Sequence, residues 1–369
     1  MSSDNTLNNN ISTQSIQLLS HKPVEFSKPT IFDQIRSSTS HVIEHAQHVT
    51  INYTQIDNEL SQHQLMYTTS ALPPTWAQSY HYCNLDNPIA TAQYILVLDS
   101  LNYCFWPCMN YEYHQLASTL KYTLDNDINA FNADNLINIT PNILQKWLQP
   151  LDDKSKYRSS SSSYRSLQTT DPTLVPIPLL QHRVDSLHEI GHVLKQLYNG
   201  HFIHMIKQCN HSANTLIELL LSNFTMYRDH CINPYTGKQI HYYKRAQILI
   251  GDLYGAFNGD TYGLFTDINE LTCFADYRIP QLLHHINILL YSDELQYTID
   301  TQQLIQSGSQ YENEIRSSTI QCIEYIRQQL QSKYNTSIMS IQLDWLLWER
   351  GESMLTQMRS HHKTLTVYY

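Results

Sequence analysis

The chain has 369 residues, a formal net charge of −10 at neutral pH and only 15% charged residues. Its nine glycines allow few tight hairpins, which argues against a β-sandwich, a β-barrel or a glycine-rich phosphate loop. The acidic balance argues against a free-standing nucleic-acid-binding protein, because such proteins carry a basic surface. We therefore expect a mostly helical protein with a sizeable buried core.

The cysteine spacing and the N-terminal composition predict the cellular compartment of the protein. Seven cysteines stand at irregular spacing without a CxxC pair, so we expect free thiols in a reducing environment. Residues 1–25 are polar and predict a disordered tail without the apolar stretch of a signal peptide. No run reaches the roughly 18 apolar residues of a membrane span. A cytoplasmic protein is the expectation.

Three helical patterns occupy the first half of the chain. Residues 31–65 form the first, in which the serines and threonine at 37–40 are candidate N-caps. Residues 91–106 are strongly apolar at helical spacing and should lie in the core. Residues 134–148 predict a short helix with Pro141 at the start of its second half.

The second half opens with a change in composition. Residues 154–170 contain five consecutive serines flanked by basic residues, which is typical of a surface insertion. The prolines around residues 174–180 predict an extended connector. Helical patterns then continue almost to the end, most clearly at 216–224, 243–253, 268–288, 314–331 and 341–348. Because no repeat or domain boundary is visible, residues 26–369 predict one large all-α domain.

The motif HEIGH at residues 188–192 is the most conspicuous conventional signal. On a helix, this pattern places His188 and His192 one turn apart as zinc ligands, with Glu189 as a general base. The chain has 19 histidines, however, and no third ligand follows at metalloprotease spacing. The favoured interpretation is a polar helix face whose core side is supplied by Val193, Leu194 and Leu197.

A basic segment begins the helical pattern at 243–253. Tyr243, Lys244 and Arg245 stand where the first helical turn leaves backbone N–H groups unpaired. Two cations beside those groups would favour an anion such as a phosphate. A solvated basic helix end is the alternative, and the sequence leaves both open.

Carboxylates on either side of residue 270 suggest a further site. Asp267 begins a capping-box pattern and predicts a helix that must be short, because Pro280 lies ahead. Asp276 would cap a second helix running to about residue 288. With Phe274 and Tyr277 beside it, this carboxylate could stabilise the ribosyl oxocarbenium ion of N-glycoside hydrolysis. A simple helix cap is the alternative role.

Asp344 lies among apolar and aromatic residues near the C-terminus. A buried carboxylate needs a partner, and the two N–H donors of a guanine-like edge would supply one. Ser340 lies one turn earlier on the same helix face. An ion pair with Arg316 or Arg350 is the alternative.

Several unusual motifs occur in the order of one known family. They are LDSLNYCFW at 98–106, YKRAQIL at 243–249, FADYRIPQ at 274–281, EIR at 314–316 and DWLLW at 344–348. On these motifs the chain resembles the queuosine 5'-phosphate N-glycosylase/hydrolase family from about residue 30 to residue 369. The resemblance implies an all-helical fold akin to the helix-hairpin-helix DNA glycosylases, acting on a free nucleotide.

The implied reaction is hydrolysis of the N-glycosidic bond of queuosine 5'-monophosphate, which releases queuine for tRNA modification. By motif position, Asp276 would be the catalytic carboxylate and Asp344 would bind the base edge. His81 stands where a family histidine contacts the base. The implied substrate-binding residues are His81, Phe274, Tyr277, Ser340, Asp344, Tyr243, Lys244 and Arg245.

Queuine is a 7-deazapurine without an N7 to protonate, so separate carboxylates for the base and for the ribosyl cation form a consistent division of labour. Asp252 or Asp267 could assist Asp276. The resemblance implies no metal or organic cofactor, a small-molecule substrate, no direct nucleic-acid or membrane partner, and we expect a monomer. The alternatives are a zinc peptidase built on His188, Glu189 and His192, and a non-catalytic helical scaffold.

Overall fold

The computed structural model describes residues 28–62, 76, 79–108, 110–152 and 174–369. The predicted tail at 1–25 and the serine-rich insertion at 154–170 lie outside these residues. The described part of the chain is predominantly helical, as predicted, and also contains two short antiparallel strand pairs.

The helices of the first half are α1 (Ile31–Glu44), α2 (Tyr53–Ser61), α3 (Pro88–Leu101), α4 (Tyr113–Asn126), α5 (Ala133–Ile137) and α6 (Pro141–Trp147). Those of the second half are α8 (Leu180–Leu197), α9 (Ile203–Gln208), α10 (Ala213–Asn223), α11 (Lys244–Ala256), α12 (Arg278–His285), α13 (Asp293–Asp300), α14 (Gln310–Tyr334) and α15 (Ser340–Ser353). Short 3-10 turns are η3 (Thr225–Tyr227), η4 (Thr261–Gly263) and η5 (Ile268–Glu270). The strand pairs join β1 (Val49–Ile51) to β4 (Leu289–Tyr291), and β2 (His230–Ile232) to β3 (Gln239–His241).

The first helix begins before the predicted cap. Thr30 caps α1 through reciprocal hydrogen bonds with Asp33, which measure 3.1 Å and 3.0 Å. Residues 37–40 therefore lie inside the helix, and their assignment as caps was wrong. The single helix predicted over 31–65 was also wrong, because β1 separates α1 from α2 and pairs with the distant β4.

The later predictions were closer to the structure. The apolar segment predicted at 91–106 is helical only as far as the end of α3 at Leu101, and residues 90–101 are all buried. The segment at 134–148 forms α5 and α6, and Pro141 is the first residue of α6. The helical pattern over 268–288, in which a short helix and a second helix were predicted, forms η5 and α12, and residues 271–277 between them are not helical.

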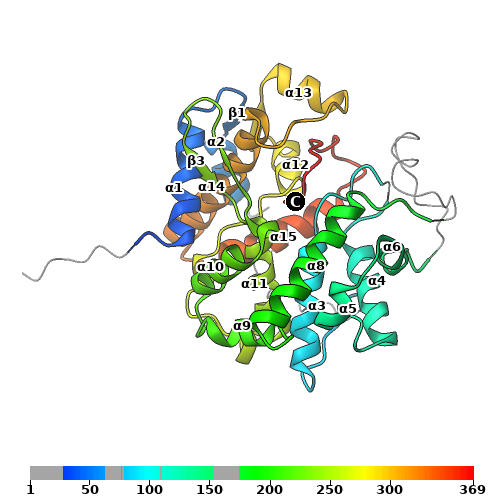
Figure 1. Cartoon of the computed structure of the whole chain (residues 1–369). Coiled ribbons are helices and arrows are strands. Elements are labelled where there is room, and N and C mark those ends of the chain that lie inside the picture. Colours follow the sequence, from blue (N-terminus) through cyan, green and yellow to red (C-terminus); the bar gives the residue numbers. More distant parts are fainter. Residues whose placement is uncertain (1–27, 63–75, 77–78, 109, 153–173) are drawn as a thin grey trace, which may run out of the picture.

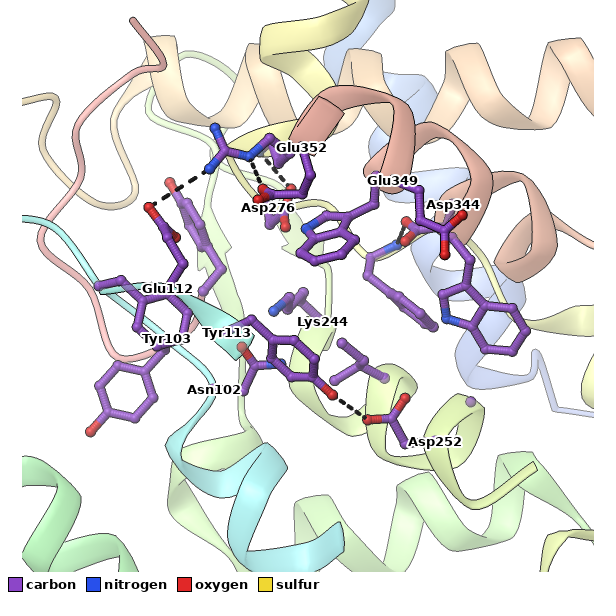
Figure 2. Close-up of a pocket in the computed structure, with 18 of the residues that line it drawn as sticks. Asn102, Tyr103, Glu112, Tyr113, Lys244, Asp252, Asp276, Asp344, Glu349 and Glu352 are labelled. Atoms are coloured by element: carbon purple, nitrogen blue, oxygen red, sulfur yellow. Dashed lines mark hydrogen bonds and ion pairs between the residues drawn. The ribbon is translucent and has the colours of Figure 1, made fainter. Parts of the chain in front are cut away.

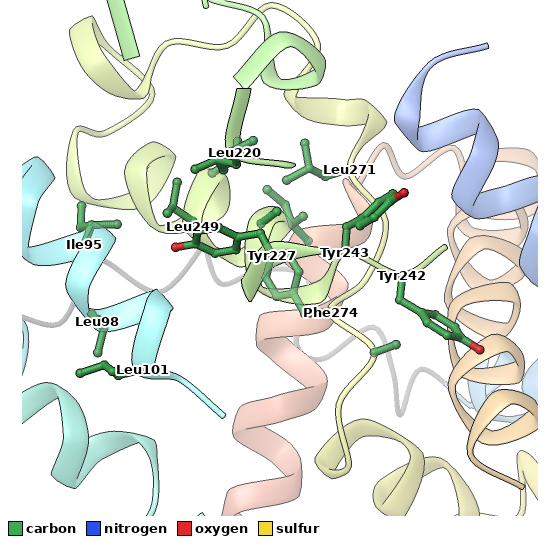
Figure 3. Packing of buried hydrophobic residues seen from close by; sticks show 14 of the residues in the cluster. Ile95, Leu98, Leu101, Leu220, Tyr227, Tyr242, Tyr243, Leu249, Leu271 and Phe274 are labelled. Carbon is green, nitrogen blue, oxygen red and sulfur yellow. The ribbon is translucent and has the colours of Figure 1, made fainter. Parts of the chain in front are cut away.

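Two groups of helices meet in the middle of the molecule. The long helix α14 packs against α1, α12 and α15, whereas α3 packs against α4, α8 and α11. In Figure 1, α15 and the C-terminal residue lie between these two groups. Ile95, Leu98 and Leu101 of α3 face the side of α11 that carries Leu249 (Figure 3). None of the helices in the described ranges is both long and apolar enough to cross a membrane.

Helix α8 approaches α5 closely at Gly191. A Cβ atom there would lie 2.7 Å from the carbonyl oxygen of Ala133 and 2.8 Å from the backbone nitrogen of Ile137. Such distances admit no side chain, so the glycine sets the spacing of the two helices. Leu194 is buried as predicted, but Leu197 is 61% exposed and does not belong to the core side.

Candidate active site

A pocket opens where α11, α12 and α15 meet the chain segments that flank α3 and α4 (Figure 2). Its wall is largely aromatic and includes Trp76, Tyr80, Tyr103, Phe105, Tyr113, Phe274, Tyr277, Trp345, Trp348 and Tyr369. Its polar lining consists of His81, Asn102, Glu112, Lys244, Asp252, Asp276, Arg278, Asp344, Glu349 and Glu352. Aromatic faces suit a flat base, and the many carboxylates suit electropositive parts of a ligand.

One face of α11 lines this pocket along most of the helix. The residues recur at helical spacing, at positions i, i+4, i+7, i+8 and i+11, and are Lys244, Ile248, Gly251, Asp252 and Gly255. A Cβ atom at Gly251 would lie 3.0 Å from Cζ of Phe274. The glycine thus lets the Phe274 ring lie against the helix.

Two neighbouring helices hold the segment before Asp276. Gln247 of α11 accepts a hydrogen bond from the backbone N–H of Thr272 at 2.9 Å and donates to its hydroxyl at 3.0 Å. The backbone N–H of Phe274 donates to Oδ2 of Asp344 on α15 at 2.7 Å. Both contacts fix the backbone immediately before Asp276.

Arg316 of α14 provides the third attachment of this segment. Its Nε donates to the carbonyl oxygen of Ala275 at 3.0 Å, and its two Nη atoms donate to the carboxylate of Asp229 at 2.9 Å and 2.7 Å. The guanidinium also lies over the ring of the C-terminal Tyr369. The peptide before Asp276 is therefore tied to a buried ion pair.

Asp276 caps the second helix as predicted, although α12 ends at His285. Its Oδ1 accepts hydrogen bonds from the backbone N–H groups of Arg278 and Ile279, at 2.8 Å and 3.3 Å. Its Oδ2 has no hydrogen-bond partner among the described residues, and the side chain lines the pocket. One oxygen is thus fixed while the other remains available to a ligand.

Asp344 is buried without either of the predicted arginine partners. Arg316 pairs with Asp229, and Arg350 lies 3.9 Å from Glu59. Burial, followed by the negative charge of Asp276, raises the pKa of Asp344 well above its usual value. Asp344 lines the pocket, and one of its oxygens accepts the backbone N–H of Phe274. The carboxyl group can therefore hold the segment before Asp276 and also contact a ligand.

Lys244 and Arg245 are adjacent in sequence but have different surroundings. Lys244 is 4% exposed, lines the pocket and forms no ion pair with another described residue. Burial lowers its pKa, and Asp276 is the strongest opposing influence. Arg245 lies outside the pocket, where its two Nη atoms each donate at 2.5 Å, to the carbonyl oxygens of Ser100 and Met226.

The first backbone N–H group of α11 is already engaged. Oδ2 of Asp229 already accepts the backbone N–H of Lys244 at 3.1 Å. Tyr243 directs its hydroxyl to Nδ1 of His241 at 2.7 Å, outside the pocket lining. The anion site predicted at this helix end stays a prediction, and of Tyr243, Lys244 and Arg245 only Lys244 lines the pocket.

Ser340 also lies outside the pocket. Its hydroxyl donates to Oε1 of Glu324 on α14 at 2.6 Å, although it shares a helix face with Asp344. Asp267 accepts hydrogen bonds from the backbone N–H groups of Ala213 and Asn214 at 2.6 Å and 3.0 Å, and so stabilises the start of α10. The capping box predicted for Asp267 was wrong.

His81 lines the pocket beside Trp76 and Tyr113. Its ring stacks on Trp76 with 3.8 Å between centroids, and its Nε2 lies 2.8 Å from the Tyr113 hydroxyl. Burial lowers the pKa of His81 to about 3, so the imidazole is neutral at physiological pH. Tyr113 in turn donates to Oδ2 of Asp252 at 3.4 Å.

Tyr277 and Arg278 form the opposite wall with acidic partners. The Tyr277 hydroxyl donates to Glu112 at 2.8 Å. Nε of Arg278 donates to Glu352 at 2.6 Å, and its Nη2 lies 3.7 Å from Glu112. Glu112, Arg278 and Glu352 were not predicted as site residues from the sequence, since their roles depend on contacts between distant segments.

A fourth residue that was not predicted is Asp99, the single charged side chain of the buried helix α3. Burial and the charge of Asp252 raise its pKa well above the usual value. An isolated carboxylate in an otherwise apolar helix was a signal that the sequence did carry.

The HEIGH motif has structural partners. His188 Nε2 lies 2.7 Å from the carbonyl oxygen of Ile139, Glu189 accepts from the backbone N–H of Thr225 at 2.9 Å, and His192 is exposed. The described residues contain a group that could hold a metal, but it comprises His41, Glu44 and His45 at the C-terminal end of α1 and includes neither motif histidine.

Comparison with known proteins identifies the family of this chain. The profile described as queuosine salvage protein matches residues 80–369. The chain is 37% identical over 343 residues to the queuosine 5'-phosphate N-glycosylase/hydrolase of Dictyostelium discoideum, covering 91% of this chain and 98% of that protein. It is 34% identical to the protein of the same name from Sphaerobacter thermophilus, covering 91% and 97%, and 31% identical to that of Mus musculus, covering 76% and 82%. The chain therefore belongs to the queuosine salvage protein family.

Proposed function

We propose that this protein hydrolyses the N-glycosidic bond of queuosine 5'-phosphate and releases queuine, with Asp276 as the catalytic carboxylate. The proposal rests on the different surroundings of the two carboxylate oxygens of Asp276. Two backbone amides of α12 hold Oδ1, while Oδ2 has no hydrogen-bond partner among the described residues and the side chain lines an aromatic pocket. The names of the relatives supply the substrate class.

In the proposed reaction, the bond between the ribose C1' and the base nitrogen breaks, and the electron pair leaves with the base. The ribosyl group becomes an oxocarbenium ion, which a fixed carboxylate stabilises in a site of low polarity. Oδ2 of Asp276 also orients the water that adds to C1'. The released base takes up a proton, and the sugar product is ribose 5-phosphate.

The remaining contacts divide between base and phosphate. Phe274, Tyr277 and His81 are proposed to border the flat base, and Asp344 is proposed to accept its N–H edge. Lys244 is proposed to meet the negative charge of the nucleotide, because it is a buried cation of the pocket without an ion-pair partner among the described residues. Tyr243, Arg245 and Ser340 are left out of this set because other residues engage them.

Several finer points belong to the same proposal. Asp276 lies at the start of α12, which follows the short helical turn η5. This arrangement is consistent with the proposed likeness to helix-hairpin-helix glycosylases. The net charge of −10 agrees with a small-molecule substrate without direct nucleic-acid binding. A cytoplasmic monomer without cofactor remains the expectation.

The test is incubation with queuosine 5'-monophosphate and detection of free queuine and ribose 5-phosphate by mass spectrometry. We expect Asp276→Asn to lower kcat by about a hundredfold or more, because asparagine keeps the cap but lacks the charge. Asp267→Asn is the matched control, since that carboxylate also caps a helix but lies outside the pocket. Folded wild-type protein that releases no queuine would contradict the proposal and favour a non-catalytic scaffold.

A further inference from the structure

The proposed chemistry leaves one pair of buried carboxyl groups without a role. Asp99 of α3 has no exposed surface, whereas Asp252 of α11 is 6% exposed and lines the pocket. The Asp99 carboxyl group lies beside the side chains of Asp252 and Asn102, although neither of its oxygens meets the full geometry of a hydrogen bond with another described residue. Within the same residues, no lysine, arginine or histidine forms an ion pair with either aspartate. Burying two such groups without cations is unfavourable unless they serve a ligand.

The pair can hold one negative charge that faces the pocket. Burial, and then the charge of Asp252, raise the pKa of Asp99 well above its usual value. Burial raises the pKa of Asp252 to about 7. Asp99 therefore keeps its proton, and Asp252 ionises readily when a cation approaches. Lys244 lies two turns earlier on α11 and opposes the rise in the pKa of both Asp99 and Asp252, but it forms an ion pair with neither and also faces Asp276 and Asp344.

The surroundings of Asp252 suit a compact organic cation. Gly251 and Gly255 flank it on the pocket face of α11, and a Cβ at Gly255 would meet Trp76 only at 3.8 Å. Tyr113 donates its hydroxyl to Asp252 at 3.4 Å, which Figure 2 shows as a contact across the pocket. Aromatic rings beside a carboxylate favour an ammonium group through their negative faces.

The substrate chemistry supplies such a cation. The base of queuosine is a 7-deazaguanine whose C7 substituent contains a secondary amine, and this amine is protonated at neutral pH. The nucleotide therefore presents three electropositive regions: the anomeric carbon in the transition state, the N–H edge of the base, and the ammonium. Asp276 and Asp344 are assigned to the first two regions.

We propose that Asp252, backed by Asp99, forms the subsite that binds the ammonium group on the C7 substituent of the base. This inference rests on the proposed function. It gives a physical reason for the enzyme to prefer a base that carries the C7 substituent. An unsubstituted deazaguanine would leave Asp252 buried without a cationic partner, and the enzyme would bind such a nucleotide weakly.

Two nucleotides with the same glycosidic bond and the same base edge test the subsite. We expect wild-type protein to show kcat/KM about ten- to a hundredfold higher for queuosine 5'-phosphate than for 7-deazaguanosine 5'-phosphate. Asp252→Asn should lower kcat/KM for queuosine 5'-phosphate more than for 7-deazaguanosine 5'-phosphate, and so remove most of this preference. Asp125→Asn, at an exposed position of α4, is the charge control and should keep the preference.

An equal fall of kcat/KM on both nucleotides in Asp252→Asn would overturn the subsite and assign the residue to packing or proton transfer. If neither nucleotide is cleaved by wild-type protein, the proposed function itself fails. A second measurement needs no variant. Wild-type protein should be inhibited about tenfold more strongly by 7-aminomethyl-7-deazaguanine than by its neutral 7-hydroxymethyl counterpart, and equal inhibition would contradict the subsite.

Discussion

Arg316 and Asp229 form a buried bidentate ion pair, in which Nη2 and Oδ2 are 2.7 Å apart. The same guanidinium holds the carbonyl oxygen of Ala275, and the same carboxylate holds the first backbone N–H of α11. One ion pair therefore fixes both the segment that presents Asp276 and the helix that presents Lys244.

Removing this guanidinium should destabilise the protein strongly. We expect Arg316→Met to lower the free energy of unfolding by about 3–5 kcal/mol, because Asp229 would remain buried without its partner. Arg327→Met is the control on the same helix, since its partly exposed pair with Glu324 should contribute less than about 1 kcal/mol. Urea denaturation measures both variants, and equal losses would contradict the central role of Arg316.

Substitutions of the adjacent residues Lys244 and Arg245 should have different effects, the first on substrate binding and the second on stability. Lys244→Met should raise KM for queuosine 5'-phosphate by about tenfold or more without lowering the melting temperature, because it removes an unpaired buried charge. Arg245→Met should lower the free energy of unfolding by about 2–4 kcal/mol, since two buried carbonyl oxygens lose their donors. Steady-state kinetics and thermal denaturation separate the two effects. A Lys244 variant with unchanged KM would remove this residue from the binding site.

Within the HEIGH motif, we expect the glycine to be important for helix packing and the second histidine to contribute little to stability. Gly191→Ala would place a methyl group against the backbone of α5, and we expect a loss of about 2 kcal/mol or more of stability. His192→Ala, at the adjacent exposed position, should change stability by less than about 0.5 kcal/mol. Denaturant titration checks this contrast, which a metal site at the two histidines would reverse.

Buried neutral histidines should make the protein sensitive to acid. Burial lowers the pKa of His362 to about 3, below its value of about 6.5 in the unfolded chain. The unfolded state then binds more protons between these values, so this stabilising contribution is complete above pH 6.5 and falls as the pH decreases. Between pH 6.5 and pH 5 the loss is about 2 kcal/mol for one histidine.

His362→Gln isolates this contribution from that of other titrating groups. The buried acids Asp99 and Asp344 have raised pKa values and act in the opposite direction. The difference in unfolding free energy between wild type and variant should therefore shrink as the pH falls from 6.5 to 5. A difference that stays constant with pH would contradict a neutral buried His362.

The sequence by itself determined the helical class, most helices and the capping role of Asp276. These features depend on local causes, namely apolar residues at helical spacing, capping side chains and proline positions. The same local reasoning failed at residues 37–40, where the true cap was Thr30, and at β1, whose partner β4 lies far along the chain. The family motifs also pointed to the residues of the pocket.

The tertiary structure decided which of the candidate residues face the pocket together. Lys244 and Arg245 share one helical turn, yet only the first reaches the pocket, because α3 and η3 surround the second. Asp344 has Phe274 as its partner in place of an arginine, and Asp99 meets Asp252 through the packing of α3 on α11. Burial and contacts between distant segments set the charge and partners of a carboxyl group, and a pattern along the chain does not contain them.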